Sequence, residues 1–537
     1  MNVPSPERSS SSQGCPLGDT TPEPGARSAE LEADVARAEI EQRILGYLDT
    51  HDAEAVGLLR RLVRIRSLAR QEGTVDQPGT VVHLLRGEIG QGERTEVVAQ
   101  SIGPTSQNLI EVLPGAGERC FIIEAHTDTV PEGQPERWFG GDPFSAAEGT
   151  VTYLGDRRIR LEVGGQTHEA TIRERMARVW ETKRRWRTAP IIYGRGAFDN
   201  KAAVASTVMA MRALAAVLPA AEARLGGTLV AAYTADEEET EVGVHALVAG
   251  PDSWLGQRGW LDGPRDAQGF LTNISGVALD GSYGYTPVVG HRGSVLLVLN
   301  VQGRAAHAST PYLGISAVEQ MSRLLVALAD GQEELVQRLL PGLDTELLGP
   351  PTLAIGTTIA GGGVRAVHRD SGATMVERGG TNAVPDWCEA TIDLRFPPGR
   401  DYPRDLATLP ERIRAEVERF LRERVPVEGW SFTLAAAGSS PPCALGRTPA
   451  EAARHPLVAL AQRAGERVLG YVPDIETAPG GTDATVMIHR GHIPTLVELG
   501  AAGGLSHDAH EYVERDQITA GAKILALMAL DVLGVVQ

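Results

Sequence analysis

Several apolar runs in this sequence end in histidines or carboxylates, the side chains that bind divalent metal ions. His126 and Asp128 follow the apolar residues 121–123, and because strand side chains alternate faces, these two point the same way. Asp199 comes just before a long apolar stretch of helical composition. Three further segments complete the set: Asp236, Glu237 and Glu238 in "TADEEET", Asp280 in "ALDGS" and His507 in "LSHDAHEYV". Such a mixture of nitrogen and oxygen donors fits a hard-to-borderline divalent cation, and zinc is the usual choice.

The elements that must gather these residues are predicted to be strands of a mostly parallel sheet. The runs at 118–128 and 226–239 are nearly continuous in apolar residues before their acidic ends, and residues 200–218 between them have helical length and composition. Strand–helix–strand order with apolar strands is typical of an α/β fold whose sheet is covered by helices. Ligands of such sheets bind at the carboxyl ends of the strands, so we expect the polar residues to meet there.

The pattern of the sequence changes at about residue 289. Alternation with period two at 293–309 and 387–398, with helical stretches between and after, predicts a smaller α+β layer with an antiparallel sheet. We therefore predict a disordered tail over 1–30, a catalytic domain in two parts and an inserted α+β domain. The catalytic domain is expected to span 31–288 and 438–537, and the inserted domain 289–437.

Composition argues against some classes of binding partner and indicates the cellular compartment. The formal net charge of −18 disfavours nucleic acids and anionic membranes as partners. The four cysteines are scattered without a CxxC pair, which argues against a disulfide framework and a cysteine zinc site. The first thirty residues contain no apolar signal-peptide core, and no apolar run is long enough to span a membrane. A cytoplasmic protein is the expectation.

Seven segments, in order, resemble one known family, the dinuclear zinc amidohydrolases and peptidases. This family includes carboxypeptidase G, aminoacylase, succinyl-diaminopimelate desuccinylase and the carnosinase-type dipeptidases. The similar segments are "HTDTVP", "GRGAFDNKA", "TADEEETEVG", "GRAAHAST", "TNAVPDWCEATIDLR", "GGTDA" and "GGLSHDAHEYV", and the similarity spans roughly 55–530. The resemblance implies a three-layer α/β catalytic domain with an inserted lid and dimerisation domain.

The resemblance also implies a role for each residue of a centre with two zinc ions, or with cobalt or manganese in their place. Asp199 would bridge the two metals. The other implied ligands are His126 and Asp280 at one metal and Glu238 and His507 at the other. Asp128 would orient the imidazole of His126 from behind. Glu237 would be the general base, which takes a proton from water and passes it to the leaving nitrogen. This register starts the family's acidic motif at Asp236 and leaves Glu239 without a role.

The lid and a nearby loop supply the remaining residues that the resemblance implies. His307 would reach the active site of a partner subunit and stabilise the oxyanion, so a homodimer formed through the lid is expected. Substrate-binding roles fall to Asn382 and to Arg395, whose guanidinium suits a carboxylate. Thr482 and Asp483 in "GGTDA" are further candidates for the polar end of the substrate.

Two departures from the family pattern leave questions open. His126 and Asp199 are much farther apart than is usual, and the surplus is residues 147–190, hereafter the insert, with two strand-like pieces and a basic helix. Long loops beside a metal site are often functional, and we hypothesise a flap that shapes substrate choice, the alternative being a surface or oligomer contact. A second surplus at 251–275 leaves Asp262 as an alternative to Asp280 for the last acidic ligand. We favour Asp280, because it ends an apolar run.

The predicted function is metal-dependent hydrolysis of a peptide or amide bond in a small substrate. An Asp rather than a Glu at the last ligand position favours a dipeptide or peptide substrate within this family. Deacylation of an N-acyl amino acid is the alternative enzyme activity. An inactive family member that acts as a binding protein is the alternative outside enzymes, and the intact Glu237 argues against it.

Overall fold

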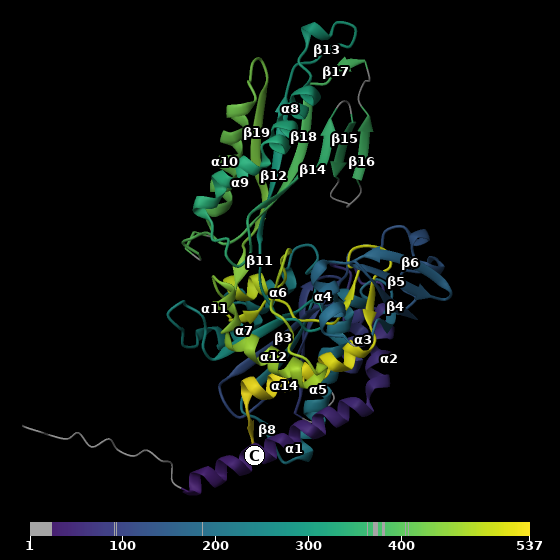
Figure 1. Cartoon of the computed structure of the whole chain (residues 1–537), viewed down its shortest axis with the longest axis vertical. Helices are drawn as coiled ribbons and strands as arrows, with labels where there is room; N and C mark the ends of the chain where they lie inside the picture. The colour runs from purple at the N-terminus through teal and green to yellow at the C-terminus, as the bar shows by residue number, and fades with distance from the viewer. Residues whose placement is uncertain are drawn as a thin grey trace, which may run out of the picture.

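The computed structural model describes residues 24–537, apart from 91, 93, 185, 362–363, 369–373, 379–381, 403 and 406, and gives the backbone alone for 24–34, 364–368 and 374–378. Most of the predicted tail, 1–30, lies outside the described residues, and helix α1 (Pro24–Thr50) begins within its last part. The chain forms a broad α/β body with an elongated second domain standing on it (Figure 1). The α/β fold with an additional inserted domain is as predicted.

The centre of the larger body is a six-stranded sheet in the order β1-β2-β9-β3-β10-β22. Its strands are β1 (Glu96–Gly103), β2 (Ser106–Leu113), β3 (Cys120–His126), β9 (Thr228–Thr234), β10 (Ile274–Leu279) and β22 (Thr495–Leu496). Strands β9, β3, β10 and β22 run parallel to one another, whereas β1 and β2 form an antiparallel hairpin at one edge, where β2 pairs antiparallel with β9. Every residue of β3 is buried, as near-continuous apolar strands covered on both faces require.

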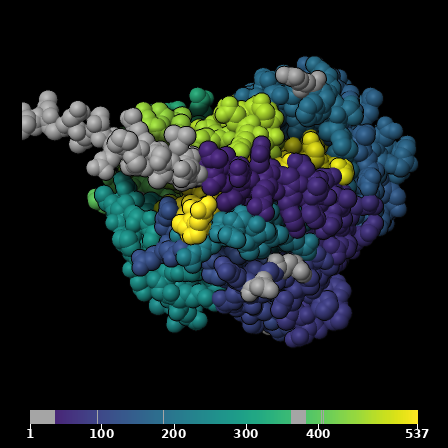
Figure 2. Space-filling model, turned by 90° about the horizontal axis from the view of Figure 1, so that it is seen from below, coloured from purple at the N-terminus to yellow at the C-terminus, as the bar shows by residue number. Residues whose placement is uncertain are grey.

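Helices cover both faces of this sheet. One face packs against the helices α2 (Asp52–Val63), α3 (Val81–Glu88), α5 (Ala202–Ala220), α12 (Pro456–Leu469) and α14 (Asp516–Leu533), and the other against α6 (Val242–Val248), α7 (Trp254–Gln257) and α13 (Ala484–His489). The stretch Ala197–Ala220 is apolar and long enough to cross a membrane, but 78% of its most apolar window is buried inside the molecule, which is the position of a core helix. Helix α1 lies across the base beside the C-terminal residues, where Arg37 pairs with Asp531 (Figure 2).

The insert builds a second sheet rather than a loose loop. The strands of this sheet lie in the order β23-β24-β7-β4-β5-β6. They are β23 (Gly503–Gly504), β24 (Tyr512–Glu514), β7 (Thr188–Tyr193), β4 (Ala147–Gly155), β5 (Arg158–Val163) and β6 (Gln166–Thr171). The predicted two strand-like pieces are thus three strands, and the basic helix is α4 (Glu174–Thr182). Tyr153, Leu161 and Trp180 belong to a hydrophobic cluster that also includes Trp138 and Tyr283 of the catalytic domain. The insert is therefore a packed extension of the catalytic domain.

The second domain, here called the lid, runs from β12 (Gly293–Gln302) to β19 (Ser431–Ser440). Its antiparallel sheet has the order β16-β15-β14-β18-β12-β19, with β14 (Thr352–Gly361), β15 (Val364–His368), β16 (Thr374–Arg378) and β18 (Trp387–Phe396). Helices α8 (Ala317–Asp330), α9 (Gln332–Leu339) and α10 (Leu409–Arg424) pack against one face of it. A two-stranded pair, β13 (Ala306–His307) with β17 (Ala383–Val384), stands at the end of the lid farthest from the catalytic domain (Figure 1).

Two further small sheets lie in the catalytic domain. One contains β11 (Val288–His291) between β20 (Cys443–Ala444) and β21 (Glu476–Ala478), at the base of the lid, and the other pairs β8 (Arg224–Leu225) with β25 (Val535–Val536). The remaining helix, α11 (Pro449–Ala453), precedes α12. Because the lid enters and leaves the catalytic domain near β11, its two connections lie side by side (Figure 1).

Candidate metal centre

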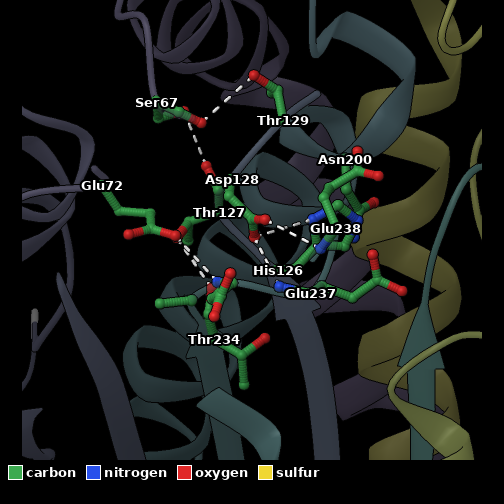
Figure 3. Close-up of polar contacts among 12 residues, drawn as sticks. Ser67, Glu72, His126, Thr127, Asp128, Thr129, Asn200, Thr234, Glu237 and Glu238 are labelled. Carbon is green, nitrogen blue, oxygen red and sulfur yellow. Dashed lines mark hydrogen bonds and ion pairs between the residues drawn. The ribbon is translucent and has the colours of Figure 1, made fainter. Parts of the chain in front are cut away.

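The site begins at the carboxyl ends of two neighbouring parallel strands. Strand β3 ends at His126, and its partner in register at the end of β9 is Thr234, directly before the acidic turn with Glu237 and Glu238. The sheet thus delivers an imidazole and two glutamates to one place, as the parallel arrangement predicts. Figure 3 shows the side chains of His126, Asp128, Glu237 and Glu238 gathered there.

Two groups of ligand-type side chains meet at this place and share Asp199. His126, Asp199 and Asp280 form one group, and Asp199, Glu238 and His507 form the other, each with its donor atoms within 4.8 Å of one another. Asp199 Oδ1 lies 3.3 Å from His126 Nε2, and its Oδ2 lies 3.3 Å from His507 Nε2. Glu238 Oε2 is 3.2 Å from the same His507 nitrogen. A carboxylate placed between two such groups has the geometry of a bridging ligand.

The surroundings of these donor atoms suit bound divalent cations. His126 is 2% exposed, yet neither of its ring nitrogens has a hydrogen-bond partner, and Glu238 Oε1 is likewise buried without one. Burial raises the pKa of Asp280 well above its usual range, and Asp199 and Glu498 raise it further. The contacts with Asp199 and Glu238 raise the pKa of His507 to about 10. Bound cations would relieve this crowding of negative charge.

Asp128 connects the two strand ends. Its Oδ1 lies 3.4 Å from His126 Nδ1, on the side of the ring away from Asp199. The same carboxylate accepts the backbone N–H groups of Glu237 and Glu238, at 3.2 and 3.1 Å. Asp128 therefore holds the acidic turn through two hydrogen bonds to a charged acceptor, worth about 1.5–3 kcal/mol each, and places its carboxylate beside His126 Nδ1.

Glu237 lies beside the ligand groups without belonging to either. Burial raises the pKa of its carboxyl well above the usual range; His126 opposes this shift, whereas Asp280, Glu238 and Asp128 add to it. Within the described residues, it is the glutamate of this turn that is close to the ligands and yet outside both groups. A carboxylate beside the ligands but not among them is placed as a general base requires.

The loop that carries Asp199 is held by a glutamate that sequence reasoning did not single out. Glu511 Oε1 accepts the backbone N–H groups of Phe198 and Asp199, both at 3.0 Å, and its Oε2 accepts those of Gly196 and the Arg195 guanidinium at 3.0 and 2.6 Å. Helix α5 begins three residues after Asp199, at Ala202. The only sequence signal was the acid at the end of "LSHDAHE", four residues after His507.

The two candidates for the last acidic ligand lie in different surroundings. Asp280 follows strand β10, and its Oδ1 is 4.0 Å from His126 Nε2. Asp262 ends a short 3₁₀ helix, Trp260–Asp262, is exposed, and belongs to neither ligand group. Glu239, one residue beyond Glu238, is also exposed and outside both groups.

The lid residues lie outside the ligand groups, and Arg395 lies apart from His307 and Asn382. His307 is exposed at the far end of the lid, where its Nε2 is 3.0 Å from Asn382 Nδ2 (Figure 1). Arg395 is near the other end of β18, paired with Asp393 through two contacts of 2.9 Å. A ten-residue strand rises about 3.3 Å per residue, so roughly 30 Å separates the two ends. The structure does not bring Asn382 and Arg395 together within one chain.

Thr482 and Asp483 turn their side chains inward. Thr482 Oγ1 donates to the Val497 carbonyl at 2.9 Å, and Asp483, 1% exposed, accepts from Thr234 Oγ1 at 3.2 Å. Asp483 and Glu124 both accept from Thr234 Oγ1, and burial raises the pKa of both carboxyls, that of Glu124 to about 7. The side chains of Thr482 and Asp483 therefore contact the strand ends of the catalytic domain.

Most of the chain matches one protein family. Residues 177–531, well over half of the chain, match the family model described as peptidase family M20/M25/M40. The chain belongs to peptidase family M20/M25/M40. The match covers Asp199, Glu237, Glu238, Asp280 and His507. The predicted family and its reaction class, metal-dependent hydrolysis of an amide or peptide bond, are confirmed.

Curated relatives of this M20-family chain share about a quarter of its residues. A succinyl-diaminopimelate desuccinylase of Methylocella silvestris is 27% identical over 447 residues, which are 82% of this chain and 88% of the relative. Succinyl-diaminopimelate desuccinylase 2 of a Ruegeria species is 25% identical over 417 residues, 78% of this chain and 81% of the relative.

Two solved structures of peptidases share the fold of this chain. A tripeptidase from Staphylococcus aureus superposes with a TM-score of 0.55 at 18% identity, covering 90% of this chain and 98% of its own. Human carnosine dipeptidase 1 superposes with a TM-score of 0.54 at 16% identity, covering 92% and 99%. At these identities the likeness is one of fold, and it extends over both the catalytic domain and the lid.

Proposed function

We propose that this chain is a metallopeptidase that cleaves the amide bond of a dipeptide or short peptide at a centre of two zinc ions. The observation that supports this most directly is the position of Asp199, 3.3 Å from both His126 and His507 and shared by the two ligand groups. Cobalt or manganese would suit the same nitrogen and oxygen donors.

The residues divide the work of hydrolysis between them. When bound, the two cations would polarise the substrate carbonyl and lower the pKa of a water molecule, which makes that water nucleophilic near neutral pH. Glu237 accepts the proton of the attacking water and then donates it to the leaving nitrogen. Asp128 keeps the His126 ring and the acidic turn in place, and Glu511 does the same for Asp199. Arg395 binds a substrate carboxylate, for which it must exchange its present partner, Asp393.

A panel of paired substrates tests this proposal. Dipeptides and N-acyl amino acids with the same C-terminal residue are offered to the zinc-loaded protein, and kcat/KM is measured for each. We expect hydrolysis of both classes of amide to depend on the metal, with the higher kcat/KM for dipeptides. The metal-free protein, prepared by chelation, is the control.

Two other outcomes of the panel would identify the alternatives. Higher kcat/KM for the N-acyl amino acids would make the chain a deacylase, an alternative that the similarity to succinyl-diaminopimelate desuccinylases favours. No turnover of any amide by protein that retains its metals would favour an inactive binding protein and contradict the peptidase proposal.

We also propose that the chain works as a homodimer formed through the lid. His307 and Asn382 lie together at the far end of the lid, away from the ligand groups of their own chain (Figure 1). Next to them, Tyr312 and Leu313 are 79% and 58% exposed, so an apolar surface surrounds the pair. A second copy related by two-fold symmetry would cover this surface and present His307 to the other active site, where it would stabilise the oxyanion.

Mixing two inactive variants tests the role of His307 in a partner subunit. His307→Ala alone is expected to lower kcat by about 10²–10³-fold, as loss of an oxyanion donor does. When the His307→Ala and Glu237→Ala chains are refolded together, half of the dimers contain one intact site, so about a quarter of the wild-type activity should return. Absence of any recovery would contradict a His307 that acts across a dimer.

The state of the cysteines supports the cytoplasmic location that we propose. Cys120, Cys388 and Cys443 are buried and unpaired within the described residues. Free buried thiols support the proposal of a reducing, cytoplasmic environment.

A further inference from the structure

Two arginines of the insert lie at the edge of the metal centre. Arg173 precedes the first residue of α4, and its Nη1 donates to the Tyr283 hydroxyl at 2.8 Å. The Arg175 guanidinium lies over the ring of the same tyrosine, 4.8 Å from its centre, and donates to the Thr477 carbonyl. Tyr283 comes three residues after Asp280. Both guanidinium groups are therefore held next to the segment that carries a metal-ligand candidate.

Glu498 links the arginines to the metal centre. Its segment packs against Asp280–Ser282, since Gly500 donates its N–H to Ser282 Oγ at 2.8 Å and leaves no room for a side chain beside the Asp280 carbonyl. Burial raises the pKa of the Glu498 carboxyl to about 7, Arg175 and Arg173 lower it, and Asp199 raises it. Glu498 is thus within electrostatic range of the two arginines on one side and of Asp199 on the other.

The packing of α4 independently places it against the other end of the centre. Met176 Cε comes within 2.9 Å of the position that a Cβ on Gly504 would occupy, and Met176 and Tyr283 belong to one hydrophobic cluster. Gly504 is three residues before His507. The start of α4 therefore lies between the segments that carry Asp280 and His507, and it belongs to the packed insert rather than to a loose loop.

The two arginines differ from their neighbours on the same segment in forming no salt bridge, although Glu498 and, for Arg175, Glu476 act on them at longer range. Farther along, Arg178 pairs with Glu476 at 3.4 Å, Lys183 with Asp474 at 3.1 Å and Arg184 with Glu514 at 2.5 Å. Within the part of the chain that the structure describes, no carboxylate oxygen lies within 4.0 Å of a guanidinium nitrogen of Arg173 or Arg175. In a chain with 69 acidic and 51 basic residues, such unpaired cations beside a metal centre have donors to spare for a ligand.

We propose that Arg173 and Arg175 form a subsite for a carboxylate of the substrate on the Asp280 side of the metal centre. Each guanidinium has N–H donors left over from its contacts with Tyr283 and Thr477, and its planar fork matches a carboxylate. The subsite selects amides that carry a second carboxylate, besides the one proposed for Arg395: an acidic side chain or a dicarboxylic acyl group. This inference rests on the proposed function and deepens it.

Matched acidic and neutral substrates test the subsite. The zinc-loaded wild type and the double variant Arg173→Gln/Arg175→Gln are compared on amide pairs that differ only in Glu against Gln, and in a succinyl against a succinamoyl group. Since hydrogen bonds to a charged group are strong, the double variant should lose about 10- to 100-fold in kcat/KM on the acidic member of each pair. Its kcat/KM on the neutral member should change less than about twofold, because the neutral member does not need the charge.

Controls separate binding of a carboxylate from support of the fold. Arg178→Gln, on the same helix but paired with Glu476, should leave the preference unchanged, and Arg173→Lys/Arg175→Lys should restore part of it because the charge remains. Binding of the acidic substrate to a Glu237→Ala protein, measured by calorimetry, should weaken when the two arginines are replaced.

Each remaining outcome has a distinct meaning. Equal losses on acidic and neutral substrates would show that the arginines only balance Glu498 or hold Tyr283, and would overturn the inference. A wild type that cleaves neutral amides as fast as acidic ones would also overturn it while leaving the proposed function intact. A wild type that cleaves no amide at all would refute the proposed function itself.

Discussion

Replacing Glu237 with alanine is expected to lower kcat by about 10²–10⁴-fold while the metal content stays that of the wild type. Glu237 lies outside both ligand groups, so its loss removes no donor, but it removes the group that would accept and return the proton. Steady-state kinetics with the best substrate of the panel and elemental analysis of the dialysed protein measure the two quantities separately.

Glu239 provides the matched control, because it is the same residue type two positions along and is exposed. Glu239→Ala should leave kcat and metal content unchanged. If Glu237→Ala lost metal in proportion to activity, Glu237 would be a ligand, and the register of the acidic turn would be shifted by one residue. If its kcat stayed near the wild-type value, the assignment of the base would be wrong.

The parts of the fold that sequence reasoning predicted are those where one pattern has one structural meaning. Nearly continuous apolar runs such as 121–123 occur in strands covered on both faces, and β3 is buried throughout. Strict alternation such as that of 387–396 occurs in a sheet with one covered face, and β18 alternates between buried and half-buried residues. The hairpin β1–β2 was not predicted, because its antiparallel pairing with β9 depends on contacts between segments far apart in the sequence.

The residues of the site also divide into those that the sequence could predict and those that it could not. Residues at strand ends, such as His126 and Asp280, could be anticipated because parallel strands bring their ends to one edge. Glu511 and Arg173 could not, because each acts through a contact that no local pattern encodes: one accepts backbone N–H groups of a distant loop, and the other meets Tyr283 across the domain. Thr482 and Asp483 lie in a recognisable loop, yet sequence alone does not tell which way a loop side chain turns.

The insert shows why a long surplus is hard to interpret from sequence. Alternation such as that of β5, where every second residue is buried, predicts strands, but the sequence does not show that these strands extend a sheet through β7. The sheet also explains why deleting 150–188 would be a poor test of its role. Such a deletion would remove buried residues such as Tyr153 and Leu161 and disturb β7, which leads directly to Asp199. Point substitutions at Arg173 and Arg175 address the same question without this damage.

Replacing Asp280 with alanine is expected to leave one metal ion per chain instead of two and to abolish most activity. Asp280 would contribute a donor to the group with His126, and the other group, with Glu238 and His507, would remain complete. Loss of a partner that only orients a ligand already costs about 10–100-fold in metal affinity, so loss of a direct ligand should cost more. Metal content after dialysis against a weak chelator, together with kcat, measures the effect.

Asp262→Ala is the matched control, since Asp262 is an aspartate of the same sequence region that is exposed and outside both groups. It should keep two metal ions and full activity. The reverse result, with metal lost from Asp262→Ala and kept by Asp280→Ala, would show that residues 251–275 rearrange around the metal in solution. Asp199 belongs to both ligand groups, whereas Asp280 belongs to one of them. A variant that loses one ion and keeps the other must therefore have lost a residue that serves one group alone.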